Sequence, residues 1–140
     1  FHRIKPQFRG GYYLHIEPGA SFFGAGFWGP NKDDLLRVRK EIEMDPEYFE
    51  KMATAKGLTQ TWGAMKGDQL KTAPKGFDKE HPGIKNLRFK QYIFTKEIPE
   101  ALLFEENFEQ WMADHFNAIR PFLDYMGEVL TSDLNGESIL

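Results

Sequence analysis

The stretch that decides the fold is residues 12–28, which read YYLHIEPGASFFGAGFW. Residues 12–17 alternate bulky and polar-capable side chains, a pattern typical of a β-strand. Pro18 and Gly19 then favour a turn, and bulky side chains return in residues 22–28. Two strands joined by a short loop that contains glycine predict an antiparallel β-hairpin.

Strand alternation places Tyr13, His15 and Glu17 on one face of the first strand. Histidine titrates near neutral pH and a carboxylate can orient it, so this row is suited to bind a ligand or to transfer a proton. The alternative is a solvated sheet face on which the tyrosine and histidine rings only pack. The opposite face of the strand carries three apolar residues: Tyr12, Leu14 and Ile16.

Two glycines, Gly24 and Gly26, interrupt the bulky residues of the second strand. They would let a ligand or another backbone approach closely, or they would make room for a large aromatic side chain. They do not form a dinucleotide-binding loop, because the third glycine and the following helix of that motif are absent.

After the hairpin, the apolar spacing becomes helical. Asn31 is suited to cap a first helix. Pro46 is well tolerated at the first position of a second helix, and Gly57 is suited to end it. Glycines and prolines then break the pattern, and only short strands are expected over residues 60–64 and 69–73.

Further elements are expected on either side of this region. Pro82 can open a short helix over residues 82–87, which His81 would cap or orient. Residues 91–95 indicate a buried strand, and residues 1–4 are interpreted as the end of an earlier strand.

The clearest helical pattern covers residues 108–130, with a broad apolar face at a spacing of 3.6 residues. Pro121 lies inside it, so the helix should be kinked there or split near Arg120. His115 lies on the apolar face and is expected to be buried and hydrogen-bonded. Residues 131–140 are expected to form a flexible tail.

These elements predict one α+β domain over residues 1–130. Its small antiparallel sheet would carry the hairpin and pack against several helices, including the long Pro-kinked C-terminal helix. Leu14 and Ile16 should then face apolar side chains of the helices: Phe49, Trp111, Phe116 and Ile119.

Three ordered strings carry a resemblance to a known family: YYLHIEPG at residues 12–19, LKTAPKGFDKEHP at residues 70–82 and RPF at residues 120–122. Together they resemble domain-of-unknown-function family 2461, a widespread bacterial and fungal family of conserved hypothetical proteins. The resemblance implies a bacterial-type intracellular protein with a further N-terminal portion, helical and then basic, that is missing here. It implies no activity and no catalytic residues.

The second of these strings lies in a lysine-rich region. Seven basic residues fall between Lys66 and Lys90, and Lys71 and Lys75 flank a proline in a glycine-containing loop. Lysine side chains and exposed backbone amides are suited to hold a phosphate or carboxylate. The alternative is a solvated lysine-rich surface. The glycine spacing excludes a P-loop.

Several other chemistries find no support. The chain has no cysteine, which excludes disulfides, thiolate metal sites and thiol nucleophiles and fits a cytoplasmic protein. The four histidines lack metal-ligand spacing and the serines lie outside a nucleophile elbow, so neither a metal nor another cofactor is expected. A formal charge of −3 argues against nucleic acid, and no apolar run approaches the roughly 20 residues that cross a bilayer.

Two functional hypotheses remain open, and the sequence indicates neither a substrate nor an oligomeric state. In the first, Tyr13, His15 and Glu17 converge with Lys71 and Lys75 on one site for a small anionic ligand, with or without catalysis. In the second, the protein is a non-enzymatic interaction or assembly module, which would show an exposed apolar patch.

Overall fold

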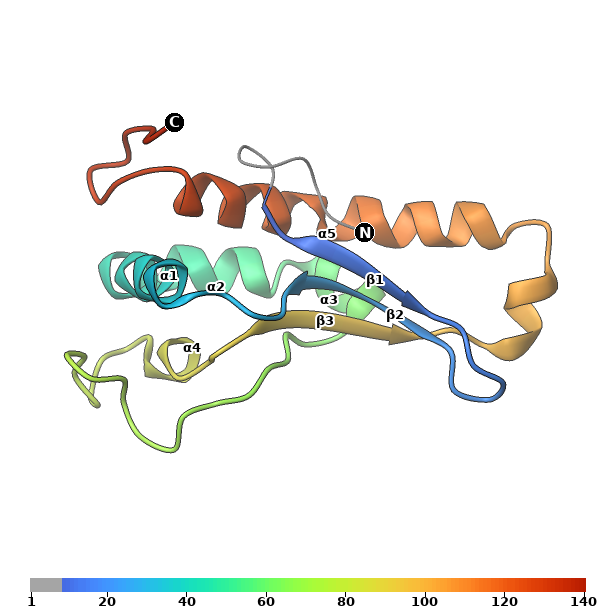
Figure 1. Ribbon diagram of the computed structural model, residues 1–140, viewed down its shortest axis with the longest axis horizontal. Helices are drawn as coiled ribbons and strands as arrows, with labels where there is room; N and C mark the ends of the chain where they lie inside the picture. Colours follow the sequence, from blue (N-terminus) through green and yellow to red (C-terminus); the bar gives the residue numbers. More distant parts are fainter. Residues whose placement is uncertain (1–8) are drawn as a thin grey trace.

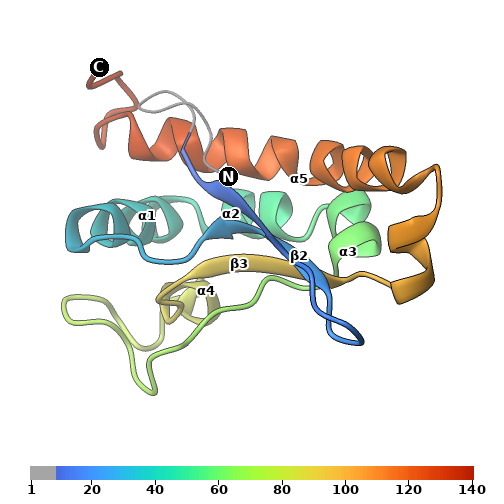
Figure 2. The ribbon, with the colours of Figure 1, turned by 45° about the vertical axis from the view of Figure 1, so that its right-hand side comes forward.

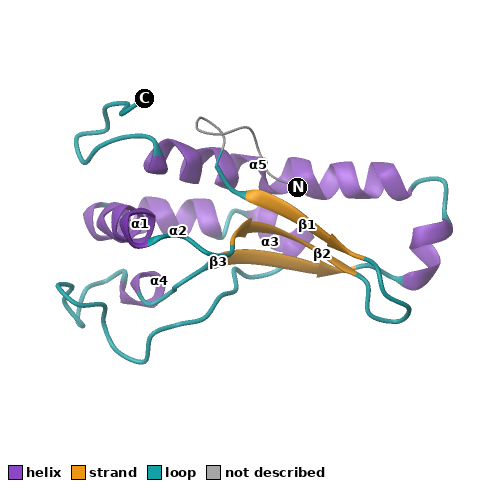
Figure 3. Cartoon of the chain, in the orientation of Figure 1, coloured by secondary structure: helices purple, strands orange, loops and turns teal. Residues whose placement is uncertain are grey.

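The structure is a computed structural model that describes residues 9–140 (Figure 1). The earlier strand expected over residues 1–4 lies outside the described residues. The elements follow in the order β1 (Gly11–His15), β2 (Phe22–Phe27), α1 (Lys32–Met44), α2 (Pro46–Ala53), α3 (Lys56–Trp62), α4 (Ile84–Leu87), β3 (Tyr92–Glu97), the 3-10 helix η1 (Glu100–Phe104) and α5 (Phe108–Leu130). This arrangement confirms the predicted α+β class (Figure 3).

The three strands form one antiparallel sheet in the order β1-β2-β3, which confirms the hairpin. β1 pairs with β2 from Gly11 opposite Gly26 to His15 opposite Phe22. On the other edge of β2, Phe22 lies opposite Glu97 of β3. The hairpin turn and the last residue of β3 therefore lie at the same end of the sheet.

An aromatic cluster joins one face of the sheet to α3 and α5, which lie behind the strands (Figure 2). The ring of Phe23 lies 4.5 Å from that of Trp62 and 5.3 Å from that of Trp111, measured between centroids. Phe94 of β3 is fully buried, with its ring 5.3 Å from that of Phe122. Alternate residues of β2 and β3 thus build the core.

β1 contributes less to this core than expected. The ring centroid of Tyr12 lies 4.5 Å from that of Phe116, and Leu14 packs against the core. Ile16 is 63% exposed, so the prediction that it faces the helices is wrong. The reason is that β1 ends at His15, and strand alternation does not continue into the turn.

The starts of the first two helices are confirmed. The side chain of Asn31 accepts a hydrogen bond of 2.8 Å from the backbone N–H of Asp34. Asp45 caps α2 in the same way, accepting from the N–H of Tyr48 at 3.1 Å, and Pro46 is the first helical residue.

The end of α2 and the element after it differ from the prediction. α2 ends at Ala53 rather than at Gly57, and α3 occupies the region where a strand was expected over residues 60–64. The indole Nε1 of Trp62 is buried and donates a hydrogen bond of 2.7 Å to the carbonyl oxygen of His115 in α5. This tertiary contact stabilises a short helix that contains a glycine and has a weak local signal.

The strand expected over residues 69–73 is also wrong. The chain makes only isolated pairs here, between Lys66 and Ile93 and between Gln69 and Phe89. The segment is therefore a loop that touches β3 and the residues before it. Pro74 and Gly76 within this loop favour turns over an extended ladder.

The short helix α4 and the strand β3 lie where the sequence predicts a helix and a strand. α4 lies inside the range expected for the short helix, and the Nδ1 atom of His81 accepts a hydrogen bond of 2.9 Å from the N–H of Gly83. His81 therefore orients the start of this helix, as expected. β3 (Tyr92–Glu97) overlaps the strand expected over residues 91–95, beginning one residue later and ending two residues later.

α5 runs unbroken through Pro121, so the helix is not split at Arg120. The kink at the proline stays a prediction. His115 is 7% exposed, and its Nδ1 donates a hydrogen bond of 2.7 Å to the carbonyl oxygen of Trp111. The expectation of a buried, hydrogen-bonded histidine is confirmed.

The residues after α5 fold back toward α1. The guanidinium group of Arg37 donates from Nε to the carbonyl oxygen of Ser132 and from Nη2 to that of Asp133, both at 3.0 Å. The flexibility of residues 131–140 stays a prediction.

Candidate functional site

The second face of the sheet points away from the described helices and toward the viewer in Figure 1. Tyr13 of β1 is 49% exposed, and Trp28, the residue after β2, is 36% exposed. The ring centroid of Tyr13 lies 6.4 Å from that of Trp28 and 5.9 Å from that of Phe22. These three rings form a partly solvated aromatic surface, which is called the open face below.

The two strand glycines shape this surface. A Cβ atom on Gly24 would lie 2.9 Å from Cζ2 of Trp28, so the missing side chain makes room for the indole ring. Gly26 has a φ of +134°, and a Cβ there would overlap the carbonyl oxygen of Tyr92. Of the two roles considered for Gly24, the structure shows space for a large aromatic side chain.

The predicted row of Tyr13, His15 and Glu17 is brought together at the end of β1. The Nε2 atom of His15 lies 2.9 Å from Oε2 of Glu17, and the rings of Tyr13 and His15 are stacked with centroids 6.4 Å apart. The His15 and Glu17 side chains are 36% and 59% exposed. Solvent screens an ion pair at such a site, so the arrangement suits hydrogen bonding to a ligand better than buried acid–base chemistry.

A cation joins the open face from the opposite edge of the sheet. The Nζ atom of Lys66 donates a hydrogen bond of 2.8 Å to Oγ1 of Thr95. Thr95 lies opposite Gly24, and Gly24 lies opposite Tyr13. Tyr13, Gly24 and Thr95 therefore form one row across the sheet, about 10 Å long at the usual strand spacing.

A groove of about 1230 Å³ adjoins this row at the edge of β3. The groove lies between the hairpin turn and the segment that leads into η1. Phe22 of the open face lines it, together with Lys66 and Thr95. Its lining is mixed in charge, with two lysines and two glutamates: Lys66, Lys96, Glu97 and Glu100.

The structure does not bring Lys71 and Lys75 to this site. The backbone N–H of Leu70, next to Lys71, bonds to the carbonyl oxygen of Arg88, which precedes β3. His15 lies at the other end of the sheet, in the same row as Glu97, the last residue of β3, with Phe22 of β2 between them. The six residues of β3 separate the two ends by roughly 17 Å at the usual rise of a strand.

Figure 1 shows the same separation, with the hairpin turn at one end of the molecule and the lysine-rich loop at the other. The single site that would join His15 to Lys75 is therefore not formed. Anion binding by the loop alone stays a prediction.

Sequence reasoning assigned neither Trp28 of the open face nor the adjoining Lys66 to this site. Trp28 continues the series of alternate positions that begins with Phe22 and includes Gly24 and Gly26, so strand alternation could have placed it. Lys66 was counted only as one of several basic residues. Its position depends on the pairing with Ile93, a contact between distant parts of the chain that no local pattern indicates.

Neither a metal-binding cluster nor a membrane-spanning helix is present within residues 9–140. No group of three or more metal-ligating side chains gathers in this part of the chain. Its helices are all too short or too polar to cross a membrane.

Comparison with known proteins places the chain in a family but assigns no activity. A family model described as "Conserved hypothetical protein (DUF2461)" matches residues 1–125 and so includes Tyr13, Trp28 and Lys66. No curated protein and no solved structure matches the chain. Because the match covers most of its length, the chain belongs to the conserved hypothetical protein family DUF2461.

Proposed function

We propose that the protein binds a small ligand on the open face, and that this ligand carries a flat ring and an anionic group. The observation that carries the proposal is the row across the sheet, in which Trp28 lies over Gly24 between exposed Tyr13 and the Lys66–Thr95 pair. Aromatic side chains offer ring faces for stacking. The ammonium group of Lys66 supplies a positive charge within reach of the same ligand.

The surroundings of Lys66 support an anionic partner. Its Nζ atom bonds to the neutral hydroxyl of Thr95, and among the described residues it makes no ion pair with a carboxylate. Glu97 lies two residues further along β3 and lines the same groove, so its charge opposes the anion. The proposal therefore requires the Lys66 contact to outweigh this repulsion, and neutralising Glu97 should tighten binding.

Titration with phenylphosphonate, followed by amide NMR shifts, tests this function. Phenylphosphonate combines a ring with an anionic group, whereas phenol and inorganic phosphate each supply one half. Saturable shifts at Tyr13, Gly24 and Thr95 with phenylphosphonate, and much weaker binding of either half, are expected. Equal binding of phenol would show that the anionic group contributes nothing and would contradict the proposal.

A second candidate is a surface for a protein partner. Ile16 is 63% exposed next to β1, and together with Tyr13 and Trp28 it gives the end of the hairpin an apolar character. Sedimentation velocity on the wild-type protein and on Tyr13→Ser distinguishes this function. A concentration-dependent dimer that the substitution abolishes would favour it, and a monomer at 100 µM would count against self-association.

We also propose that the protein works in the bacterial cytoplasm. The absence of cysteine supports a reducing compartment. Fractionation of cells that express the full-length protein tests this location, and recovery in the extracytoplasmic fraction would contradict it.

A further inference from the structure

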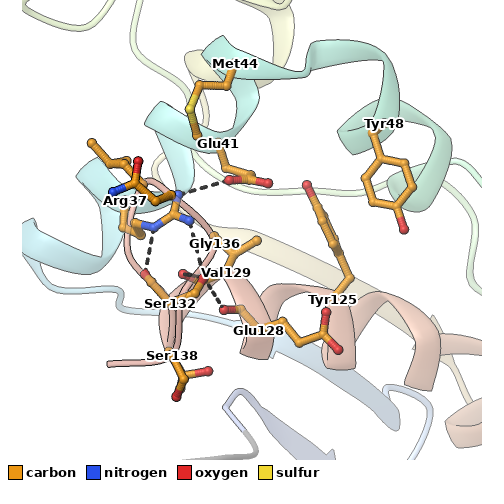
Figure 4. A pocket seen from close by; sticks show the side chains of 13 residues that line it. Arg37, Glu41, Met44, Tyr48, Tyr125, Glu128, Val129, Ser132, Gly136 and Ser138 are labelled. Carbon is orange, nitrogen blue, oxygen red and sulfur yellow. Dashed lines mark hydrogen bonds and ion pairs between the residues drawn. The ribbon is translucent and has the colours of Figure 1, made fainter. Parts of the chain in front are cut away.

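A second pocket, of about 550 Å³, lies beside the C-terminal end of α5 (Figure 4), the end that is remote from the hairpin turn in Figure 1. It is bounded by α1, the start of α2, the last turns of α5 and the turn that follows α5. It shares no lining residue with the groove beside β3. Its lining includes Arg37, Glu41, Met44, Tyr48, Tyr125 and Glu128.

The hydroxyl group of Tyr125 is the unusual feature of this pocket. Tyr125 is only 8% exposed, yet its Oη atom is buried and has no hydrogen-bond partner among the described residues. Its ring is fixed from two sides, with its centroid 5.2 Å from that of Tyr48 and 6.2 Å from that of Phe49. Buried polar atoms are nearly always satisfied, so this unpartnered hydroxyl group, which points toward Glu41 at the pocket (Figure 4), marks the place where a molecule would bind once the covering side chains shift.

The hydroxyl group also stays neutral. Burial raises the pKa of Tyr125 well above its ordinary value, and the nearby carboxylate of Glu41 raises this pKa further. A neutral phenol can accept a hydrogen bond from a ligand donor with its oxygen and donate its own proton to a neighbouring carboxylate.

The charge of the pocket favours a cation. Arg37 is the basic residue of the lining, but its Nη1 pairs with Glu41 at 3.1 Å and its other nitrogens donate to the carbonyl oxygens of Ser132 and Asp133. Arg37 and Glu41 therefore neutralise each other, and Glu128 gives the lining a net negative charge. The ring of Tyr48 supplies an aromatic face.

We propose that this pocket binds a small organic cation with a primary ammonium group. The ammonium group donates a hydrogen bond to Oη of Tyr125 beside the carboxylate of Glu41, and the carboxylate of Glu128, at the other end of the Tyr125 ring (Figure 4), adds a longer-range attraction. The alkyl part packs against Tyr48 and Met44, which are both partly exposed at its mouth. This site is separate from the open face, and its occupant has the opposite charge.

The first test compares n-butylammonium with 1-butanol, which has the same chain and no charge. Isothermal titration and amide NMR shifts should show saturable n-butylammonium binding with shifts at Glu41, Tyr48 and Ser132. Binding of 1-butanol should be at least fivefold weaker. Equal affinity for the two probes, or no saturable shift at these residues with 10 mM n-butylammonium, would overturn the proposal.

The second test uses a matched pair of tyrosines. Tyr92 is the other residue whose buried hydroxyl group has no partner in the described part of the chain, but it does not line this pocket. Tyr125→Phe should weaken n-butylammonium binding by at least about tenfold, as expected for one lost hydrogen bond to a charged group. Tyr92→Phe should leave the affinity unchanged, and an equal effect of both substitutions would refute the assignment.

Glu128→Gln provides a variant whose folding is not in question, because this side chain is exposed. It should weaken n-butylammonium binding by at least threefold and leave the weaker 1-butanol binding unchanged. An unchanged affinity for n-butylammonium would show that the carboxylate takes no part and would overturn the electrostatic basis of the proposal.

Discussion

The indole Nε1 of Trp62 donates a buried hydrogen bond of 2.7 Å to the carbonyl oxygen of His115, and this bond ties α3 to the middle of α5. The Trp62 ring also packs 5.8 Å from that of His115 and 4.5 Å from that of Phe23. One side chain therefore connects two helices and the sheet.

Trp62→Phe should lower the free energy of unfolding by about 2 kcal/mol. The substitution removes the hydrogen bond and leaves a small cavity where the larger ring was. Urea unfolding followed by circular dichroism measures the change. Trp28→Phe is the control, because Trp28 lies at the surface, and an effect of similar size at both positions would contradict the special role of Trp62.

Gly24→Ala should displace the ring of Trp28 from the open face. The added Cβ atom would lie 2.9 Å from Cζ2 of Trp28 and 3.2 Å from the carbonyl oxygen of Phe94, so the indole ring must move. The free energy of unfolding should fall by about 1 kcal/mol, and the amide and indole NMR signals of Trp28 should shift.

Gly57→Ala is the matched control for this substitution. A Cβ atom at Gly57 meets nothing within 4 Å, and the residue lies inside α3. Alanine should therefore stabilise the protein by about 0.5–1 kcal/mol through its higher helix propensity. Stabilisation by Gly24→Ala as well would show that the indole ring does not depend on the glycine.

Stability should fall as the pH drops below about 6.5, the ordinary pKa of histidine. Burial lowers the pKa of His115, so the unfolded chain binds a proton at pH values where the folded protein keeps this ring neutral. His115→Gln should reduce the loss of stability between pH 7.5 and 5.0, measured by urea unfolding. The ring of His15 is more exposed, so His15→Gln is the control. An equal reduction of the acid-induced stability loss in His15→Gln would argue against burial as the cause.

Tyr92→Phe should maintain the free energy of unfolding at pH 7 or raise it by up to about 1 kcal/mol, because it removes a buried hydroxyl group that has no partner. Burial raises the pKa of Tyr92, an effect that nearby Arg39 partly offsets. The stability that this raised pKa supplies is present below pH 10 and is lost as the pH rises further. The alkaline loss, measured by denaturant unfolding from pH 9 to 11, should be smaller in Tyr92→Phe than in Tyr13→Phe.

Much of this fold could be predicted because its signals are local. Strand alternation and the Pro18-Gly19 turn define the hairpin, and the helix caps at Asn31 and Asp45 lie where the sequence indicates them. α3 could not be predicted in this way. Its sequence contains Gly57 and precedes another glycine, and the contact that stabilises it comes from α5, more than fifty residues away.

The candidate site was predictable only in part for the same reason. Tyr13 and His15 share one strand, so their common face follows from the two-residue repeat. Whether a lysine from another segment joins them depends on the register between β3 and the loop before it. That register places Lys66 beside Thr95 and leaves Lys75 at the opposite end of the sheet from His15. Neither the composition of the loop nor the spacing of its residues distinguishes the two lysines.

Lys66, rather than Lys71 or Lys75, holds the anionic group of the ligand that we propose for the open face. The most direct test is the dissociation constant of phenylphosphonate for the wild-type protein, Lys66→Gln and Lys71→Gln, measured by amide NMR at one ionic strength. The account predicts at least fivefold weaker binding for Lys66→Gln and no change for Lys71→Gln. Equal affinities of the wild-type protein and Lys66→Gln, or loss of binding in Lys71→Gln alone, would contradict it.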